Sequence, residues 1–119
     1  MKRIAFTAPK TAELVDAPDF AGPLNPQELR GRTLVSLVSP GTELNSGFLG
    51  KSFPSFPGYA AVFAVEEVGE EISDVKPGEA VYFAGGHSDF QKAWRSTVVP
   101  VPTGLSPETA VFARLMASP

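Results

Sequence analysis

The chain has 119 residues, a formal net charge of −3 and no cysteine. Its hydrophobic fraction of 43% is typical of a folded protein, and the length suits one domain with a real core. No basic cluster stands out, so nucleic acid and anionic membranes are poor partner candidates. The lack of cysteine excludes disulfides, thiolate metal sites and thiol nucleophiles, and it fits a cytoplasmic location.

Short strands separated by turns are expected at the N-terminal end. Residues 2–7 and 13–16 are predicted strands, with a turn at Pro9 and Lys10 that also ends the N-terminal apolar run too early for a signal peptide. Residues 17–26 contain several prolines and are predicted to form a loop, and residues 27–30 a helical turn or more loop. No stretch approaches the length of a membrane helix.

Residues 33–38 (TLVSLV) are apolar on both faces and predict a well-buried strand. Pro40 and Gly41 end that strand, and Thr42 or Ser39 can cap a short helical turn. The aromatic segment 48–56 follows and should cover something apolar, because its phenylalanines would otherwise be exposed together.

The central stretch, residues 57–83, predicts two strands. Residues 60–68 and 80–83 are the apolar runs, and an acidic cluster and the Pro77-Gly78 breaker lie between them. The paired glycines of the next segment, Gly85 and Gly86, permit a tight turn.

A further strand is expected over residues 91–99, which include Trp94, and residues 100–102 should leave the sheet in an extended form. A helix then starts at Ser106-Pro107-Glu108 and runs over residues 109–117. Many short strands and one helix predict a mainly β domain, either a partly open barrel or a sandwich.

Several segments occur together in one order and carry a resemblance to a known family. The chain resembles the N-terminal, GroES-like catalytic domain of the medium-chain dehydrogenase/reductase family, which includes the zinc-type alcohol dehydrogenases and their zinc-free relatives. The matching segments are SPGTE (39–43), FPGY (56–59), VEEVG (65–69), VKPGEAV (75–81), GGHSDF (85–90) and the final helix (106–116).

The resemblance implies a GroES-like, partly open β-barrel with a C-terminal helix, spanning residues 1–119. In the family this domain forms the substrate side of a cleft, and a following Rossmann domain supplies NAD(H) or NADP(H). Hydride passes across that cleft between the nicotinamide and a small alcohol or carbonyl substrate.

The zinc ligands of the family are replaced in this sequence. The zinc-type Cys-Gly-Thr-Asp reads Pro40-Gly41-Thr42-Glu43, and the Gly-His-Glu reads Gly58-Tyr59-Ala60. A catalytic zinc usually takes three protein ligands, which one histidine and scattered carboxylates do not provide. We therefore expect no zinc or other metal.

The cofactor half is also missing from these 119 residues. No G-x-G-x-x-G follows a strand and no βαβ unit is predicted, so no residue is assigned to dinucleotide binding. We expect an excised or truncated domain, inactive alone, with NAD or NADP bound only in the full-length protein. The alternative is a naturally short, non-enzymatic binding or assembly module that uses the apolar faces of the barrel.

Three residues are candidate catalytic groups, each with a simpler structural interpretation. The resemblance gives Thr42 the role of relaying a proton from a substrate alcohol, although a helix cap would also use its hydroxyl. Tyr59 occupies a lost zinc-ligand position, where it either donates a hydrogen bond to a substrate carbonyl or fills space. His87 either exchanges protons near neutral pH or is structural.

Other prominent side chains are interpreted structurally. Glu43 is expected to pair locally at its turn. Trp94 and the phenylalanines of residues 48–56 are expected in the core or on a domain-facing surface. If the Rossmann domain is missing, part of this apolar surface is exposed and self-association is expected.

Overall fold

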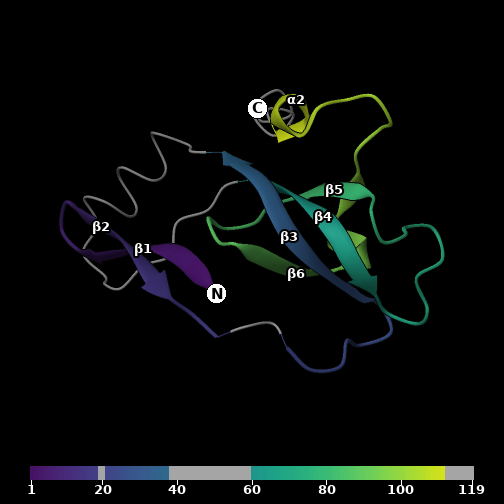
Figure 1. Cartoon of the computed structure of the whole chain (residues 1–119), viewed down its shortest axis with the longest axis horizontal. Helices are drawn as coiled ribbons and strands as arrows, with labels where there is room; N and C mark the ends of the chain where they lie inside the picture. Colours follow the sequence, from purple (N-terminus) through teal and green to yellow (C-terminus); the bar gives the residue numbers. More distant parts are fainter. Residues whose placement is uncertain (19–20, 38–59, 112–119) are drawn as a thin grey trace.

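The computed structural model describes residues 1–18, 21–37 and 60–111, and these are mainly β (Figure 1). The strands fall into a two-stranded and a five-stranded antiparallel sheet. The elements are β1 (Lys2–Ala8), β2 (Thr11–Asp16), β3 (Glu28–Leu37), β4 (Ala60–Val68), β5 (Ala80–Phe83), β6 (Phe90–Trp94), the 3₁₀ turn η2 (Arg95–Thr97), β7 (Val99–Pro100) and the helix α2 (Pro107–Val111).

The larger sheet curls into a partly open barrel. Its strand order is β6-β3-β4-β5-β7, so β6 and β7 lie at opposite edges. Only η2 and Val98 separate these two strands along the chain, a span of at most about 17 Å between Trp94 and Val99. The two edges must therefore approach each other, and the predicted mainly β, partly open barrel is confirmed.

Strand β4 is the centre of the fold because both of its faces are buried. Phe63 and Val65 lie in one apolar cluster, which also contains residues from β3, β5, β6, the β4–β5 connection and the segment between η2 and β7: Leu29, Ile72, Val75, Val81, Ala93 and Val98. Ala60 and Val62 lie in a second cluster, beneath α2, with Leu37, Ala110 and Val111. The apolar run 60–68 has no polar alternation at its start for this reason, and its predicted bounds are confirmed, as are those of 80–83.

The N-terminal hairpin forms the smaller sheet. Strands β1 and β2 pair antiparallel, and Lys10 takes a positive φ of 58° in the turn between them. The first strand agrees with the predicted 2–7, whereas β2 begins at Thr11 instead of residue 13. In Figure 1 this hairpin lies to one side of the larger sheet.

Strand β3 begins earlier than the sequence suggested. Residues 27–30 were predicted as a helical turn or loop, but Glu28 already pairs with Trp94 of β6 and Leu29 pairs with Val68 of β4. Leu29 is completely buried, which explains why tertiary pairing overrides the weak local signal.

The same strand is less buried than predicted at one position. Leu34 is 47% exposed, although residues 33–38 were expected to be buried on both faces. The register with β4 shifts between Thr33 and Val35, so Leu34 has no partner on β4 and is displaced from the ladder. Val38 lies outside the described residues.

The predicted single strand 91–99 is wrong. It divides into β6, which ends at Trp94, the turn η2, and the short strand β7 at Val99–Pro100. The chain leaves one edge of the sheet here and joins the other, which a continuous strand cannot do. Pro100 occupies an edge strand, where its missing N–H removes no hydrogen bond from the interior of the sheet.

The helix start was predicted correctly. Helix α2 begins at Pro107, and the backbone N–H of Thr109 donates to Ser106 Oγ at 3.2 Å. Its Ala110 and Val111 close the second apolar cluster at the top of Figure 1. The rest of the predicted helix, residues 112–117, lies outside the described part of the chain.

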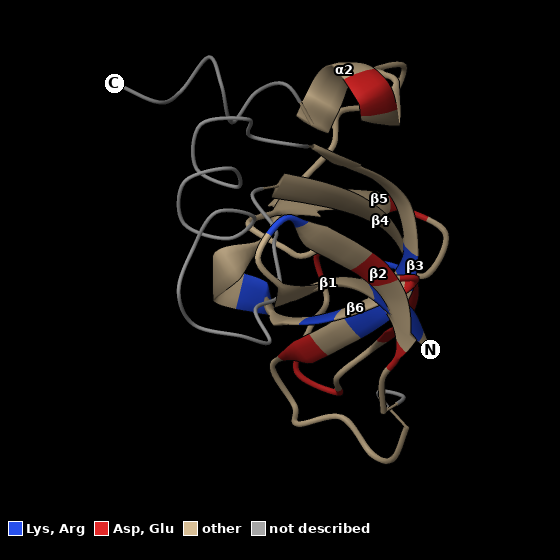
Figure 2. Cartoon of the chain, turned by 90° about the vertical axis from the view of Figure 1, so that its left-hand side faces the viewer, with Lys and Arg blue, Asp and Glu red and all other residues tan. Residues whose placement is uncertain are grey.

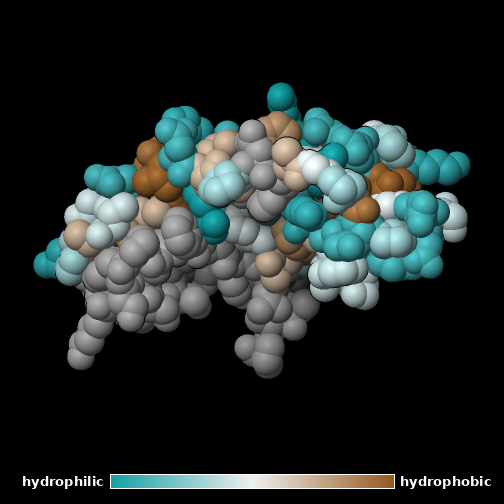
Figure 3. Space-filling model, turned by 90° about the horizontal axis from the view of Figure 1, so that it is seen from below, coloured by the Kyte–Doolittle hydropathy of each residue, from teal (hydrophilic) through white to brown (hydrophobic). Residues whose placement is uncertain are grey.

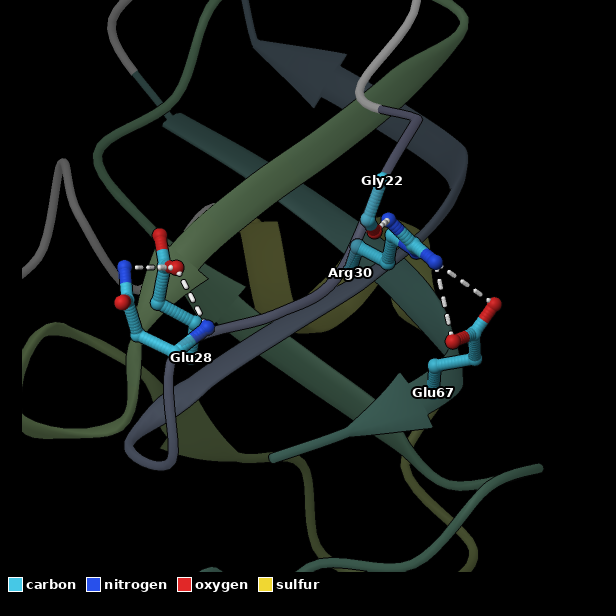
Figure 4. Close-up of polar contacts among 5 residues, drawn as sticks. Gly22, Glu28, Arg30 and Glu67 are labelled. Carbon is cyan, nitrogen blue, oxygen red and sulfur yellow. Dashed lines mark hydrogen bonds and ion pairs between the residues drawn. The ribbon is translucent and has the colours of Figure 1, made fainter. Parts of the chain in front are cut away.

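Polar contacts made by Arg30 and Glu28 hold the segment before β3 against the sheet (Figure 4). Arg30 Nη1 donates to the carbonyl of Gly22 at 2.7 Å, and its Nη2 donates to both carboxylate oxygens of Glu67 at 2.9 Å. The carboxylate of Glu28 accepts from the backbone N–H of Asn25 at 2.9 Å. These contacts fix where the preceding loop enters β3.

The surface carries charges of both signs. Figure 2 shows acidic and basic positions on β3, whereas β6 carries only a basic one and β5 carries no charge. On the face seen in Figure 3, the apolar side chains of the described residues form separate patches among polar ones. No helix among the described residues is long and apolar enough to cross a membrane.

Candidate functional site

The loop between β5 and β6, residues 84–89, carries the candidate residue His87 and lies between the two sheets. On one side, the N–H of Ile4 in β1 donates to the carbonyl of His87 at 2.8 Å. On the other side, the N–H of Thr33 in β3 donates to the carbonyl of Asp89 at 2.8 Å. The loop is therefore fixed by backbone hydrogen bonds from both sheets.

The imidazole of His87 pairs with a hydroxyl from β3. Ser36 Oγ and His87 Nδ1 are 2.6 Å apart, and both residues are half-buried. In one tautomer the hydroxyl donates to Nδ1, and in the other the ring N–H donates to the hydroxyl oxygen. The pair thus contains a group that can release a proton and a group that can accept one.

Gln91 braces the loop from inside. Its side chain is buried, with 4% exposure, and its Nε2 donates to Gly86 O at 2.8 Å and to Thr33 Oγ1 at 3.0 Å. A Cβ on Gly85 would lie 2.4 Å from the Phe83 ring and 3.2 Å from Gln91 Oε1. Gly85 is therefore needed so that the turn can pack closely against Phe83 and Gln91.

The irregularity in β3 lets two hydroxyls reach this loop. Residues three apart in a regular strand point to opposite faces of the sheet. The register shift between Thr33 and Val35 breaks that alternation, and both Thr33 and Ser36 contact residues 86–91. The bulge thus contributes directly to the geometry of the site.

Of the three predicted catalytic residues, the structure describes only His87. Thr42 and Tyr59 lie outside the described residues, as do Glu43 and the phenylalanines of residues 48–56. Trp94, predicted to be in the core or on a domain-facing surface, is 49% exposed. Its large exposure excludes the core.

Sequence reasoning missed Ser36 and Gln91. A serine inside the apolar run TLVSLV was a usable signal, because a polar side chain in such a strand needs a partner. Gln91 gave no comparable signal, since its burial depends on how the loop folds back over β3.

Neither the paired glycines nor the acidic and histidine side chains of the described residues have the arrangement of a dinucleotide or metal site. Gly85 and Gly86 lead into β6 instead of a helix N-terminus, so they lack the geometry that binds a pyrophosphate. Within residues 1–18, 21–37 and 60–111, no three histidine, aspartate or glutamate side chains are grouped to hold a metal.

No protein-family model matches the sequence, and no curated protein is significantly similar to it. Solved structures do match. Galactitol-1-phosphate dehydrogenase from Escherichia coli aligns over 94% of this chain with a TM-score of 0.75 and 18% identity. For 2R,3R-butanediol dehydrogenase from Bacillus subtilis the values are 93%, 0.74 and 14%. For the quinone oxidoreductase of E. coli complexed with NADPH they are 93%, 0.69 and 23%.

The chain has the GroES-like fold of the medium-chain dehydrogenases and reductases. The fold predicted from the order of the sequence motifs is thus confirmed. The chain spans 41%, 43% and 36% of the galactitol-1-phosphate dehydrogenase, the butanediol dehydrogenase and the quinone oxidoreductase, respectively. It therefore corresponds to one part of each of these larger enzymes.

Proposed function

We propose that this chain is the substrate-side domain of a zinc-independent, NAD(P)-dependent oxidoreductase of the medium-chain dehydrogenase/reductase type. The observation that carries the proposal is the shared fold over more than nine tenths of the chain with dehydrogenases and a quinone oxidoreductase. The substrate class is a small alcohol or carbonyl compound. A Rossmann domain is the partner that would supply NAD or NADP, and the location is cytoplasmic.

The hydroxyl–imidazole pair gives the domain a proton-transfer group. We assign His87 as the group that exchanges a proton with the substrate oxygen, directly or through one water. Ser36 is a positioning residue, because its hydrogen bond to Nδ1 fixes the ring orientation and the tautomer. Thr42 and Tyr59 are proposed as further polar contacts to the substrate on sequence grounds.

The proposed absence of zinc rests on the sequence. The chain contains no cysteine and one histidine, and that histidine already bonds to Ser36 through Nδ1. Metal analysis of the purified protein after dialysis against zinc should give well below one zinc per chain. Stoichiometric zinc that a chelator removes with loss of activity would contradict this part of the proposal.

The cofactor assignment can be tested in two steps. NADH and NADPH are first titrated into the 119-residue chain and followed by nicotinamide fluorescence, and no saturable binding is expected. The longest natural protein that contains this sequence is then assayed with both cofactors against quinones, aldehydes and alcohols. Hydride transfer to or from one of these classes is expected, and its absence across all of them would overturn the proposal.

The role of His87 has a separate test in that protein. The substitution His87→Gln should lower kcat about 100-fold with little change in KM, because general acid–base catalysis typically contributes at least that factor. Ser36→Ala should lower kcat about tenfold and alter the pH profile, and Ser36→Thr should retain most activity. Ser96→Ala, at an exposed hydroxyl of η2, is the matched control. An unchanged kcat in His87→Gln would leave His87 a structural residue.

A further inference from the structure

Strand β2 is an open edge of the N-terminal hairpin. It pairs with β1 on one side, and no described residue pairs with its other side. Strand β1, by contrast, is bonded on both sides, because the N–H of Ile4 donates to His87 O at 2.8 Å and Lys2 O accepts from Asp89 N at 2.9 Å. The hairpin therefore ends at β2 in a row of backbone groups that the described part of the chain leaves unpaired. Such an edge is a template for another strand.

The hydrogen-bonding pattern shows which groups of β2 face outward. Met1 and Ala17 exchange both backbone hydrogen bonds, from Ala17 N to Met1 O at 2.7 Å and from Met1 N to Ala17 O at 2.9 Å. Opposite residues in an antiparallel pair alternate between such bonded pairs and non-bonded pairs. Counting back along β2 from Ala17, the N–H and C=O groups of Ala12, Leu14 and Asp16 therefore point away from β1. None of these backbone groups bonds to a described residue.

The middle of this edge is apolar. Leu14 is 67% exposed, and its partner on β1, Ile4, is 37% exposed. Residues directly opposite each other in an antiparallel pair point to the same face, so the two side chains form one apolar strip that ends at the open edge. Natural edge strands that stay single often carry a charge or a proline against further pairing. A leucine at this position instead favours a partner strand with an apolar residue at the same place.

A second β2 strand fits this edge in an antiparallel register. When Leu14 lies opposite Leu14 of a second copy, the outward groups of Ala12 meet those of Asp16 of that copy, and the reverse. This register gives roughly six backbone hydrogen bonds between the copies. The two leucines also extend the apolar strip, which then runs from Ile4 of one copy to Ile4 of the other across four strands. The arrangement has a two-fold axis, so each copy supplies the same surface.

The charges of β2 favour this register over its neighbours. Glu13 lies opposite Val15 of the second copy, and Asp16, which pairs with Lys2 of its own chain at 2.5 Å, lies opposite Ala12 of the second copy. No like charges are opposed along the strand. Sliding the strands toward the β1–β2 turn by one hydrogen-bonding repeat places Glu13 opposite Glu13, which is destabilising. Sliding them the other way shortens the ladder to the end of the strand.

We propose that the chain forms a two-fold dimer by antiparallel pairing of β2 with β2 of a second copy. The strand is complementary to itself in its hydrogen-bonding groups, in its apolar centre and in its charges, which favours a second copy over an unrelated peptide. The ladder is short and its contact area is small, so we expect a dissociation constant on the order of 100 µM. The pairing uses neither the Ser36–His87 pair nor a cofactor, so it is independent of the proposed oxidoreductase function.

The first test is sedimentation equilibrium of the 119-residue chain between about 10 µM and 1 mM. The weight-average mass should rise from the 12.6 kDa of one chain toward twice that value. In ¹⁵N NMR spectra over the same range, the amide signals of Leu14 and Asp16 should shift more than those of Glu13 and Val15, because only the former gain hydrogen-bond acceptors. A mass that stays at one chain, or a dimer whose shifts lie outside β2, would overturn the proposal.

Charge exchange at position 14 tests the register. Leu14→Lys and Leu14→Glu should each abolish the dimer, because the two-fold axis then places like charges opposite each other. An equal mixture of the two variants should restore a dimer, because opposite charges then face each other across the axis. Its dissociation constant should lie within about tenfold of the wild-type value.

Leu34→Lys is the matched control, since Leu34 is another exposed leucine, at 47%, and lies outside the hairpin. This variant should dimerise like the wild type. Circular dichroism and thermal unfolding report whether each variant is folded, and recovery of the dimer in the mixture shows the same for both variants at position 14. Loss of the dimer in Leu34→Lys, or a mixture of folded Leu14→Lys and Leu14→Glu that stays monomeric, would contradict the pairing through β2.

Discussion

At the scale of single residues, Glu28 shows how a carboxylate is held inside the start of a strand. The backbone N–H of Asn25 lowers the pKa of Glu28 from its usual value of 4.5, and the side chains of Asn25 and Lys92 lower the pKa further, although burial opposes them. Lys92 Nζ lies 3.7 Å from Glu28 Oε2. The carboxylate is charged in the folded chain and secures the turn before β3.

The free energy of unfolding should therefore depend on pH in the acid range. Because the pKa of Glu28 is lower in the folded chain than in the unfolded chain, its contribution is complete above pH 4.5 and is lost as the pH falls below that value. Urea unfolding between pH 3 and pH 6 should show stability decreasing toward pH 3.

The matched variants for this prediction are Glu28→Gln and Glu70→Gln. The amide oxygen of Gln at position 28 can still accept from Asn25, so the variant removes the charge and keeps the hydrogen bond. Its stability should change less between pH 3 and pH 6 than that of the wild type. Glu70→Gln removes an exposed carboxylate and should retain the wild-type slope. Equal slopes in Glu28→Gln and the wild type would contradict the assignment.

At the scale of elements, β3 determines the shape of the molecule because it pairs with β4 on one side and β6 on the other. Its register with β4 shifts at two points, between Arg30 and Gly31 and between Thr33 and Val35. The first shift is possible because Gly31 has no side chain: a Cβ there would lie 1.8 Å from the backbone oxygen of Ala64. The second shift brings Thr33 and Ser36 to the same loop.

The substitution Gly31→Ala should therefore be strongly destabilising. The clash is with backbone, which cannot move without breaking the ladder, so we expect a loss of about 3 kcal/mol or more in the free energy of unfolding. Gly22→Ala is the comparison, since Gly22 has a positive φ of 97° and open space around it. There only backbone strain applies, and the loss should be about 1 kcal/mol. Thermal and urea unfolding of both variants measure the difference, and equal losses would show that close packing at Gly31 is unimportant.

At the scale of the whole molecule, Arg95 stabilises the connection between β6 and β7, the two edge strands of the barrel. It lies in η2 between β6 and β7, and its Nη1 donates to Val98 O at 3.1 Å. Its Nε and Nη2 donate to the carboxylate of Asp74 at 3.1 and 2.7 Å, and its N–H donates to Gln27 O at 2.8 Å. Segments from three parts of the chain are thus tied to one residue.

Arg95→Ala should lower the free energy of unfolding by about 1–2 kcal/mol, because three hydrogen bonds from a partly buried guanidinium are lost. Asp74→Asn should cost less, since the exposed ion pair is screened by water and the bond to Val98 remains. Raising the salt concentration should reduce the difference between wild type and Asp74→Asn. If Arg95→Ala unfolds at the same urea concentration as the wild type, the contact contributes nothing to barrel closure.

The sequence by itself determined the class of fold and its central strands. Three kinds of local feature could be predicted: the apolar runs 60–68 and 80–83, the Pro-Gly turns and the Ser106-Pro107 helix start. Each depends only on residues that are neighbours in the sequence. The GroES-like fold was predicted from the resemblance of the ordered motifs to those of a known family. The absence of cysteine and the single histidine likewise follow from the sequence alone.

The tertiary structure alone decided how distant segments combine into sites. The early start of β3 depends on its pairing with both β4 and β6, and the division of residues 91–99 depends on barrel closure. The Ser36–His87 pair joins residues 51 positions apart in the sequence. It depends on a bulge in β3 that the local sequence pattern does not predict. The sequence therefore shows which reactive side chains are present. Which of them meet in the folded chain depends on the strand register, and packing across the sheet sets that register.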